Sequence, residues 1–233
     1  MDIIRGIFFD FDNTIVDYME SDTKAIKEVK KLSGISIEDD EFIDKSVEAL
    51  LEFYKKLENG EETECNIHKY RLRNTLIQFG VEWREEYASI YLDNYLNSCN
   101  CFEGCRELLE ILKCRSVLGI LTNSYNVDEQ RKRIEYTGLS MYFDDIVISN
   151  EIKIFKPQKE AFFYLSDKYG LSPKECIYIG DSEQYDIVGA KNAGFHAIRI
   201  AHNGKIVNKS KADFVCYSFE ELKDILLSNY KFA

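Results

Sequence analysis

The chain has 233 residues, a formal net charge of -11 and 45% hydrophobic residues, a composition typical of a folded globular protein. An acidic chain lacks the basic patches that bind phosphate backbones, so we expect no nucleic-acid partner. The sequence contains no apolar run long enough to cross a membrane and no signal-peptide pattern at its N-terminus, so we expect no membrane partner and a cytoplasmic location.

The first predicted element is a buried strand over residues 4–9, and Asp10 and Asp12 follow it directly. From about residue 19 to 98 the apolar residues recur with a helical period, which predicts amphipathic helices over 20–32, 40–57, 66–79 and 83–96. No strand pattern interrupts this block. We therefore predict an all-helical domain, residues 17–99, inserted into a core that consists of residues 1–16 and 100–233.

After Gly104, helices and strands are predicted in alternation. They are a helix over 106–113, a strand over 117–121, a helix over 128–137, a strand over 145–148, a helix over 159–169, a strand over 176–179, a helix over 186–193, strands over 196–200 and 214–216, and a helix over 219–227. Such alternation predicts the α/β class, with a doubly wound parallel sheet covered by helices on both faces.

Polar residues follow the predicted strands at their carboxyl ends, the edge at which parallel sheets bind ligands. They are Asp10, Asp12, Thr122, Asn123, Lys156, Asp181 and Asp186. Four carboxylates in one cleft repel one another unless a cation lies among them. Oxygen ligands of this kind suit Mg²⁺, which usually takes one or two carboxylates together with waters and a substrate phosphate.

The spacing of Asp10 and Asp12 indicates two different roles at one site. Residues i and i+2 of an extended segment point to the same side. One carboxylate can attack phosphorus to form an aspartyl-phosphate, and the other can handle the proton of the leaving oxygen. Lys156 would offset the charge of the phosphoryl group, and the Thr122 hydroxyl would hold its oxygens.

Four segments resemble, in order, the four motifs of the haloacid dehalogenase superfamily. They read Asp-Phe-Asp-Asn-Thr-Ile-Val-Asp, Leu-Thr-Asn-Ser, Lys-Pro, and Gly-Asp-Ser-x-x-x-Asp-Ile-x-Gly-Ala-x-x-Ala-Gly. The resemblance covers the whole chain, and the helical insertion looks like the C1 cap of that family. It implies that Asp10 is the nucleophile and a magnesium ligand. It also implies that Asp12 is the general acid and base and lends the metal its backbone carbonyl.

The same resemblance implies roles for the remaining residues of the four motifs. Thr122 and Asn123 would bind the phosphoryl group, and Lys156 would steady both the nucleophile and the transferred phosphate. Asp181 would bind magnesium directly, and Asp186 would hold the metal shell.

Two positions depart from the family pattern. Asn13 stands where glycine is commonest, and asparagine tolerates left-handed backbone angles better than most residues. Residues 151–155 lack the glycine that often precedes the lysine of the third motif, which leaves the shape of that loop open.

These features favour a phosphatase that acts on a small phosphorylated metabolite. A dehalogenase on the same fold is disfavoured, because a halide leaves without a proton and its enzymes lack an acid at the position of Asp12. A phosphomutase, a non-enzymatic binding protein and a specificity of the 5'-nucleotidase type stay open as alternatives, as does the choice between monomer and homodimer. The Asp-x-Asp-Asn-Thr form looks closest to the nucleotidase and acylneuraminate phosphatase branches.

The seven cysteines are odd in number and form no Cys-x-x-Cys pair, which favours reduced thiols. Three of them cluster as Cys99, Cys101 and Cys105, but no histidine or second cysteine pair accompanies them at the spacing of a zinc site. We interpret them as packing thiols.

Overall fold

The computed structural model describes residues 3–61, 63, 67–202 and 207–232. Cys65 and the predicted start of a helix at Asn66 lie outside the described residues. The chain divides into two compact units, one made of Met1–Asp17 with Asn100–Ala233 and the other of Tyr18–Cys99. All cysteines among the described residues are free thiols.

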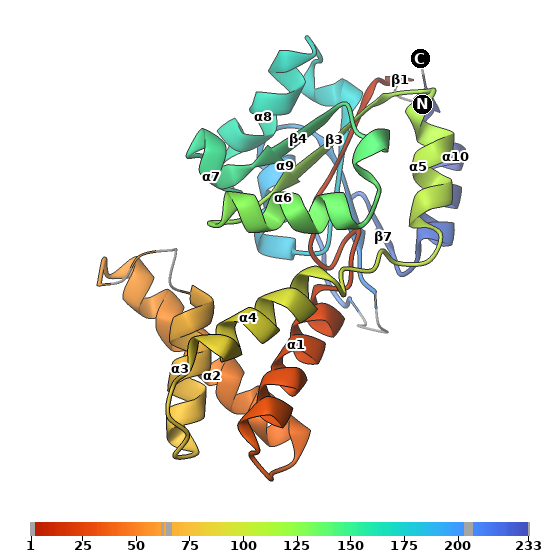
Figure 1. Ribbon diagram of the computed structural model, residues 1–233. Helices are drawn as coiled ribbons and strands as arrows, with labels where there is room; N and C mark the ends of the chain where they lie inside the picture. The colour runs from red at the N-terminus through yellow and green to blue at the C-terminus, as the bar shows by residue number, and fades with distance from the viewer. Residues whose placement is uncertain (1–2, 62, 64–66, 203–206, 233) are drawn as a thin grey trace. The chain divides into compact units, whose positions relative to one another are not determined.

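The first unit is built on a six-stranded parallel sheet (Figure 1). Its strands, in spatial order, are β4 (Asp145–Ile148), β3 (Val117–Thr122), β2 (Gly6–Phe9), β5 (Cys176–Gly180), β6 (His196–Ile200) and β7 (Phe214–Cys216). Strand β2 is buried along its whole length because it lies between β3 and β5. The carboxyl ends of these three central strands therefore meet at one edge of the sheet.

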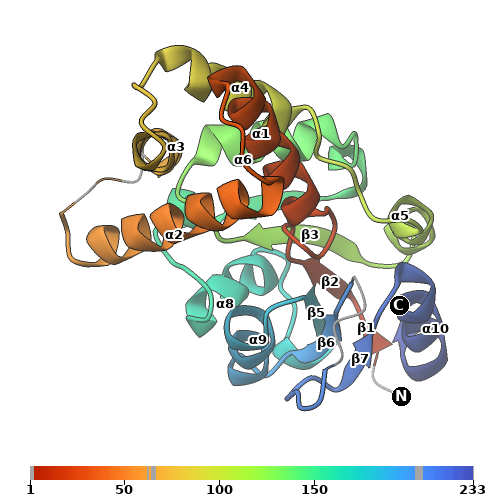
Figure 2. The ribbon, with the colours of Figure 1, turned by 90° about the horizontal axis from the view of Figure 1, so that it is seen from below.

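Helices cover both faces of this sheet, which confirms the predicted α/β class (Figure 2). The helices of this unit are α5 (Cys105–Lys113), α6 (Val127–Tyr136), α7 (Ser149–Ile152), α8 (Lys159–Lys168), α9 (Val188–Asn192) and α10 (Phe219–Asn229), with 3-10 turns at Ser140–Tyr142 and Pro173–Glu175. Helices α5 and α10 lie on one side of the sheet, and α8 and α9 lie on the other. The core beneath α8 and α9 is apolar and aromatic, and Phe8, Phe162, Tyr178 and Phe195 are buried in it.

Two elements differ from the sequence prediction. The predicted strand 4–9 is divided at Arg5, since β1 (Ile3–Ile4) pairs with β8 (Lys231–Phe232) in a separate two-stranded sheet. The Arg5 amide donates to the Glu175 carbonyl just before β5 at 2.9 Å, and the Arg5 carbonyl accepts from the Val117 amide of β3 at 2.8 Å. The predicted helix 186–193 begins earlier, as a π-helical turn, η4 (Glu183–Ile187), that leads into α9.

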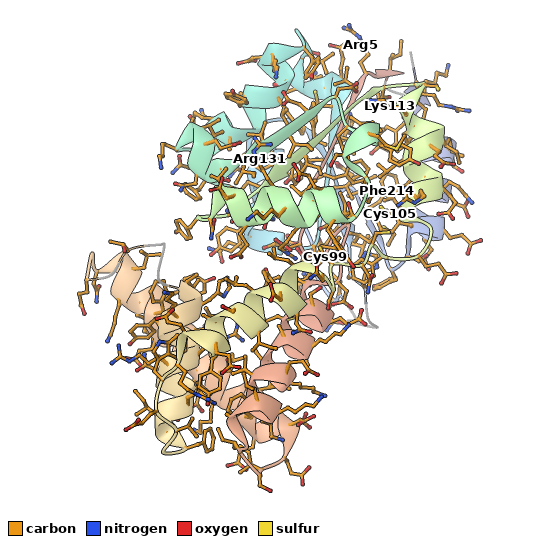
Figure 3. All side chains as sticks on the ribbon, in the orientation of Figure 1. Arg5, Cys99, Cys105, Lys113, Arg131 and Phe214 are labelled. Atoms are coloured by element: carbon orange, nitrogen blue, oxygen red, sulfur yellow. The ribbon has the colours of Figure 1, made fainter. Side chains whose placement is uncertain are left out.

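Ion pairs lie at the edge of the sheet at which the strands begin. Arg5 pairs with Glu175 at 3.2 Å, and Lys113 pairs with Asp144 at 2.8 Å (Figure 3). These pairs are partly exposed, so each contributes little to stability. They lie at the strand starts, whereas the polar residues predicted to act on substrate follow the strand ends.

The second unit is all helical. It consists of α1 (Tyr18–Ser33), α2 (Asp39–Glu58), α3 (Ile67–Gln78) and α4 (Glu85–Leu96), with α1 packed on α4 and α2 packed on α3. Arg71 is fully buried in this unit, where its guanidinium grips the Asp22 carboxylate at 2.7 and 2.9 Å. Arg71 therefore serves the packing of these helices. In the described part of the chain, every helix is too short or too polar to span a membrane.

Candidate active site

Asp10 is held at the carboxyl end of β2 by the sheet itself. Its backbone amide donates to the Ile179 carbonyl of β5 at 2.9 Å, which continues the parallel ladder by one residue. The flanking Phe9 and Phe11 are fully buried, so the Asp10 carboxylate is anchored from both sides and is itself only 7% exposed. Burial is the largest effect on this carboxyl, and it raises the pKa of Asp10 well above its usual range.

Lys156 joins two of the predicted carboxylates. Its ammonium lies 2.6 Å from Asp10 Oδ1 and 2.7 Å from Asp186 Oδ1, and it donates to the Tyr178 hydroxyl at 2.9 Å. Burial opposes a charged lysine, but the two carboxylates outweigh it and raise the pKa of Lys156. The lysine is therefore a fixed cation at this site.

Tyr178 is a site residue that the sequence did not reveal. It lies within β5, where a tyrosine has the appearance of an ordinary core residue. Its hydroxyl donates to the Leu121 carbonyl at 2.7 Å and so presents its lone pair to Lys156. This bond gives the buried ammonium a third acceptor and fixes its position.

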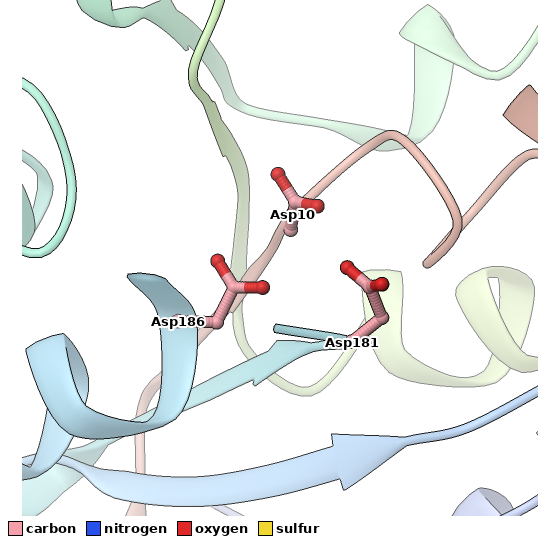
Figure 4. Close-up of side chains that lie close together, drawn as sticks. All are labelled: Asp10, Asp181 and Asp186. Atoms are coloured by element: carbon pink, nitrogen blue, oxygen red, sulfur yellow. The ribbon is translucent and has the colours of Figure 1, made fainter. Parts of the chain in front are cut away.

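Asp10, Asp181 and Asp186 lie together (Figure 4), and one carboxylate oxygen of each lies within 4.8 Å of the other two. Asp186 is oriented by the Ser182 amide, which donates to its Oδ2 at 2.9 Å, while Oδ1 faces Lys156. Three carboxylates and one ammonium leave a net charge of -2 in a small, largely buried volume. Such a set of oxygen donors fits a hard divalent cation.

The last residue of β3, Thr122, and the residue that follows it, Asn123, make different contacts at the site. Thr122 is buried, and its hydroxyl accepts a hydrogen bond from the Gln130 side chain at 3.1 Å. The Asn123 side chain turns instead toward Ser149 and Lys156: it accepts from the Ser149 hydroxyl at 2.5 Å and from the Lys156 amide at 3.0 Å. Its Nδ2 also donates to the Lys156 carbonyl at 3.0 Å. The Asn123 amide group thus shapes the backbone that carries the lysine.

Asp12 is bound by two side chains of α6 that the sequence analysis missed. Gln130 donates to Asp12 Oδ2 at 2.8 Å, and Arg133 lies 2.6 Å from Asp12 Oδ1. Both residues belong to a strongly charged helix, in which the buried face is not evident from the sequence. That sequence is Val-Asp-Glu-Gln-Arg-Lys-Arg-Ile-Glu-Tyr. The available signal was the spacing of Gln130 and Arg133 from the apolar Ile134, which places all three on one side of the helix.

Among the described residues other than glycine, two adopt left-handed backbone angles. Asn13 has φ of 57°, as expected from its place in the first motif, and the turn is closed by a bond from its amide to the Val16 carbonyl at 2.8 Å. Lys153 has φ of 56° at the end of α7. This is the loop that lacks a glycine, so the chain forms the left-handed turn with a lysine.

Comparison with known proteins identifies the family. The model of the haloacid dehalogenase-like hydrolases matches residues 4–194, and the chain belongs to this family of enzymes. The chain is 28% identical over 226 residues to N-acylneuraminate-9-phosphatase from Homo sapiens, covering 89% of this chain and 86% of that protein. It is 28% identical over 171 residues to the pyrimidine 5'-nucleotidase YjjG from Escherichia coli, covering 72% of this chain and 75% of that protein.

A solved structure leads to the same family. The magnesium-bound HAD-hydrolase YfnB from Bacillus subtilis, a structure described as revealing interdomain movement, superposes with a TM-score of 0.79 at 25% identity and covers 96% of this chain and 99% of that chain. The predicted haloacid dehalogenase fold and hydrolase class are confirmed.

Proposed function

We propose that the protein is a magnesium-dependent phosphatase that hydrolyses a small phosphate monoester through an aspartyl-phosphate on Asp10. The observation that carries this proposal is the buried arrangement in which Lys156 bridges Asp10 and Asp186, beside Asp181. The Asp10 nucleophile and the phosphate are both anions and repel each other. A buried ammonium beside Asp10 reduces this repulsion. The phosphatase relatives support the same reaction class.

The proposed first step transfers the phosphoryl group to the protein. An oxygen of Asp10 attacks phosphorus, the bond from phosphorus to the ester oxygen breaks, and Asp12 gives a proton to the departing alkoxide. Lys156 keeps Asp10 in place and offsets charge on the phosphoryl oxygens. The Thr122 hydroxyl accepts from Gln130 and so has its own proton to donate to a phosphoryl oxygen.

The proposed second step returns the enzyme to its starting state. Asp12, now a carboxylate, takes a proton from water, the water oxygen attacks phosphorus, and the bond to Asp10 breaks to release inorganic phosphate. Asn123 would act here through its backbone amide, because its side chain is occupied by Ser149 and the Lys156 backbone.

Asp10, Asp181 and Asp186, together with the backbone carbonyl of Asp12, would hold Mg²⁺. The bound ion would supply positive charge that neutralises the phosphate as the nucleophile approaches. The fit rests on the oxygen-only donor set and its negative charge.

Asp12 distinguishes this proposal from a dehalogenase, since a halide needs no proton when it leaves. A phosphomutase would use the same residues and would differ in how well water is excluded. We propose further that the helical unit, residues 17–99, acts as the cap that selects the substrate. The nucleotidase and acylneuraminate phosphatase relatives make phosphorylated sugars and nucleotides the first compounds to test.

The test is phosphate release by the purified protein from p-nitrophenyl phosphate and from a panel of phosphorylated metabolites, with Mg²⁺ and with EDTA. The proposal predicts turnover that requires Mg²⁺. Absence of phosphate release from every compound would refute the phosphatase assignment. Transfer of phosphate within a substrate, without its release, would favour the mutase.

A further inference from the structure

Helix α6 carries a buried polar pair that reaches Asp12. Gln130 is 3% exposed and Arg133 is fully buried, although the helix is otherwise rich in solvent-facing charge. Asn126 caps the start of this helix by accepting from the Glu129 amide at 3.2 Å, which fixes where the helix begins. The two buried side chains are three residues apart and share one face.

The hydrogen-bond donors determine how these side chains are oriented. Arg133 can only donate, and its Nη1 lies 3.0 Å from Gln130 Oε1, so the Gln130 amide must turn its NH₂ group away from Arg133. That NH₂ group donates to Asp12 Oδ2 at 2.8 Å and to the Thr122 hydroxyl at 3.1 Å. Arg133 adds an ion pair, in which its Nη2 lies 2.6 Å from Asp12 Oδ1. Both oxygens of Asp12 are thereby held from one side.

Packing fixes Arg133 in turn. Its guanidinium lies over the Phe11 ring, 5.4 Å from the centroid, and the Phe11 side chain is fully buried. Burying a guanidinium without a charged partner costs on the order of several kcal/mol. Here the partner is the Asp12 carboxylate, whose side chain is 26% exposed. A partly exposed aspartate can change rotamer, and the contacts with Gln130 and Arg133 restrict that freedom.

We propose that Gln130 and Arg133 are positioning residues that hold the Asp12 carboxyl group in the orientation required for proton transfer to the leaving oxygen. This inference rests on the proposed phosphatase function. Neither residue carries a reacting atom, and both affect proton transfer through Asp12. Gln130 also aligns the Thr122 hydroxyl, so one amide coordinates the proton-transfer group with a phosphate-binding group.

The test compares two substrates that differ in their need for an acid. Phenyl phosphate releases a basic phenolate and depends on protonation, whereas p-nitrophenyl phosphate releases a stable anion and depends on it little. The quantity measured is kcat/KM, which covers the steps up to loss of the leaving group. Gln130→Met keeps the side-chain volume and removes the donor. Arg131→Met is the matched control, because Arg131 lies on the same helix and pairs with Glu151 at the surface (Figure 3).

We expect Gln130→Met and Arg133→Met to lower kcat/KM for phenyl phosphate by about 10²-fold and for p-nitrophenyl phosphate by only about threefold. Arg133→Lys should restore part of the loss, and Arg131→Met should change neither value. A thermal melt establishes whether each variant is folded. If Arg133→Met does not fold, Gln130→Met alone provides the test.

Equal losses with both substrates in a folded Gln130→Met variant would overturn the positioning role and leave the phosphatase function intact. A wild-type protein that hydrolyses neither ester would overturn both proposals. The two failures are therefore distinguishable.

Discussion

The ammonium of Lys156 lies 2.6 Å from Oδ1 of Asp10, and both side chains are buried although they stand 146 positions apart in the chain. The pairing joins the central strand β2 to the loop that follows α7. It places a positive charge beside the Asp10 carboxylate oxygens. Burial alone would favour the protonated form of Asp10, and this charge opposes that effect.

Replacing Lys156 removes this charge. We expect Lys156→Met to lower kcat for p-nitrophenyl phosphate by a factor on the order of 10² or more, because a preorganised cation in a buried site is worth far more than one in water. Lys191→Met is the control, since Lys191 pairs with Asp213 on the surface, and it should retain full activity. A Lys156→Met enzyme that keeps most of its turnover would show that the bridge is structural.

Gly180 leaves room for Asp186. A Cβ at position 180 would lie 2.4 Å from the Asp186 carboxyl carbon, so Gly180→Ala must displace that carboxylate. We expect the Mg²⁺ affinity, measured by calorimetry, to fall about tenfold or more, as it does when groups that orient a metal ligand are disturbed.

Gly119→Ala provides the control for this substitution. A Cβ there would meet Phe8 at 3.0 Å, within the core of the same sheet and away from the carboxylates. It should lower the melting temperature and leave the Mg²⁺ affinity unchanged. Equal effects of the two alanines on affinity would contradict the proposed role of Asp186 in the metal site.

The raised pKa of Asp10 predicts a pH-dependent penalty in the absence of metal. The unfolded chain ionises this carboxyl at lower pH than the folded protein does, so its contribution to stability is fully present below the unfolded pKa and is lost as pH rises through the folded pKa. Asp10→Asn removes the titration while its amide oxygen still accepts from Lys156.

In EDTA at neutral pH, Asp10→Asn should therefore be more stable than the wild type by on the order of 1 kcal/mol, and the gap should close in acid. Urea denaturation at a series of pH values measures both effects. A gap that stays constant with pH would mean that burial of the Asp10 charge is not its cause. Added Mg²⁺ should stabilise the wild type more than the variant.

Lys153 occupies a left-handed backbone position that glycine adopts without strain. We expect Lys153→Gly to raise the free energy of unfolding by about 0.5–1 kcal/mol. Lys153→Ala separates backbone strain from loss of the side chain. Like Lys153→Gly it loses the bond to Asn150, but it keeps a Cβ, so it should not raise the free energy of unfolding. Stabilisation by alanine equal to that by glycine would refute backbone strain as the reason.

The strand ends explain why much of the candidate site was predictable. Asp10 and Asp181 directly follow β2 and β5, while Lys156 and Asp186 lie in the segments that lead on from β4 and β5, and parallel topology brings such segments to one edge. The division of the first strand at Arg5 was not predictable, because the two-stranded sheet depends on pairing with residues at the far end of the chain. Short segments of this kind carry little local signal.

The supporting residues escaped prediction for a related reason. Tyr178 has the pattern of a core residue within β5, and only the fold shows its hydroxyl meeting Lys156. Gln130 and Arg133 lie among surface charges of α6, and their burial follows from the packing of that helix. Asn123 was predicted to bind the phosphoryl group, and that role stays a prediction; what the sequence did not reveal is that its side chain bonds to the Lys156 backbone.

The central claim is that the phosphoryl group passes through Asp10. The most direct measurement is mass spectrometry of the protein after acid quenching during turnover with p-nitrophenyl phosphate and Mg²⁺. The account predicts one phosphoryl group on the peptide that contains Asp10, and none on the same peptide of Asp10→Asn, which should also be inactive. Steady turnover without any phosphorylated peptide, or full activity in Asp10→Asn, would contradict it.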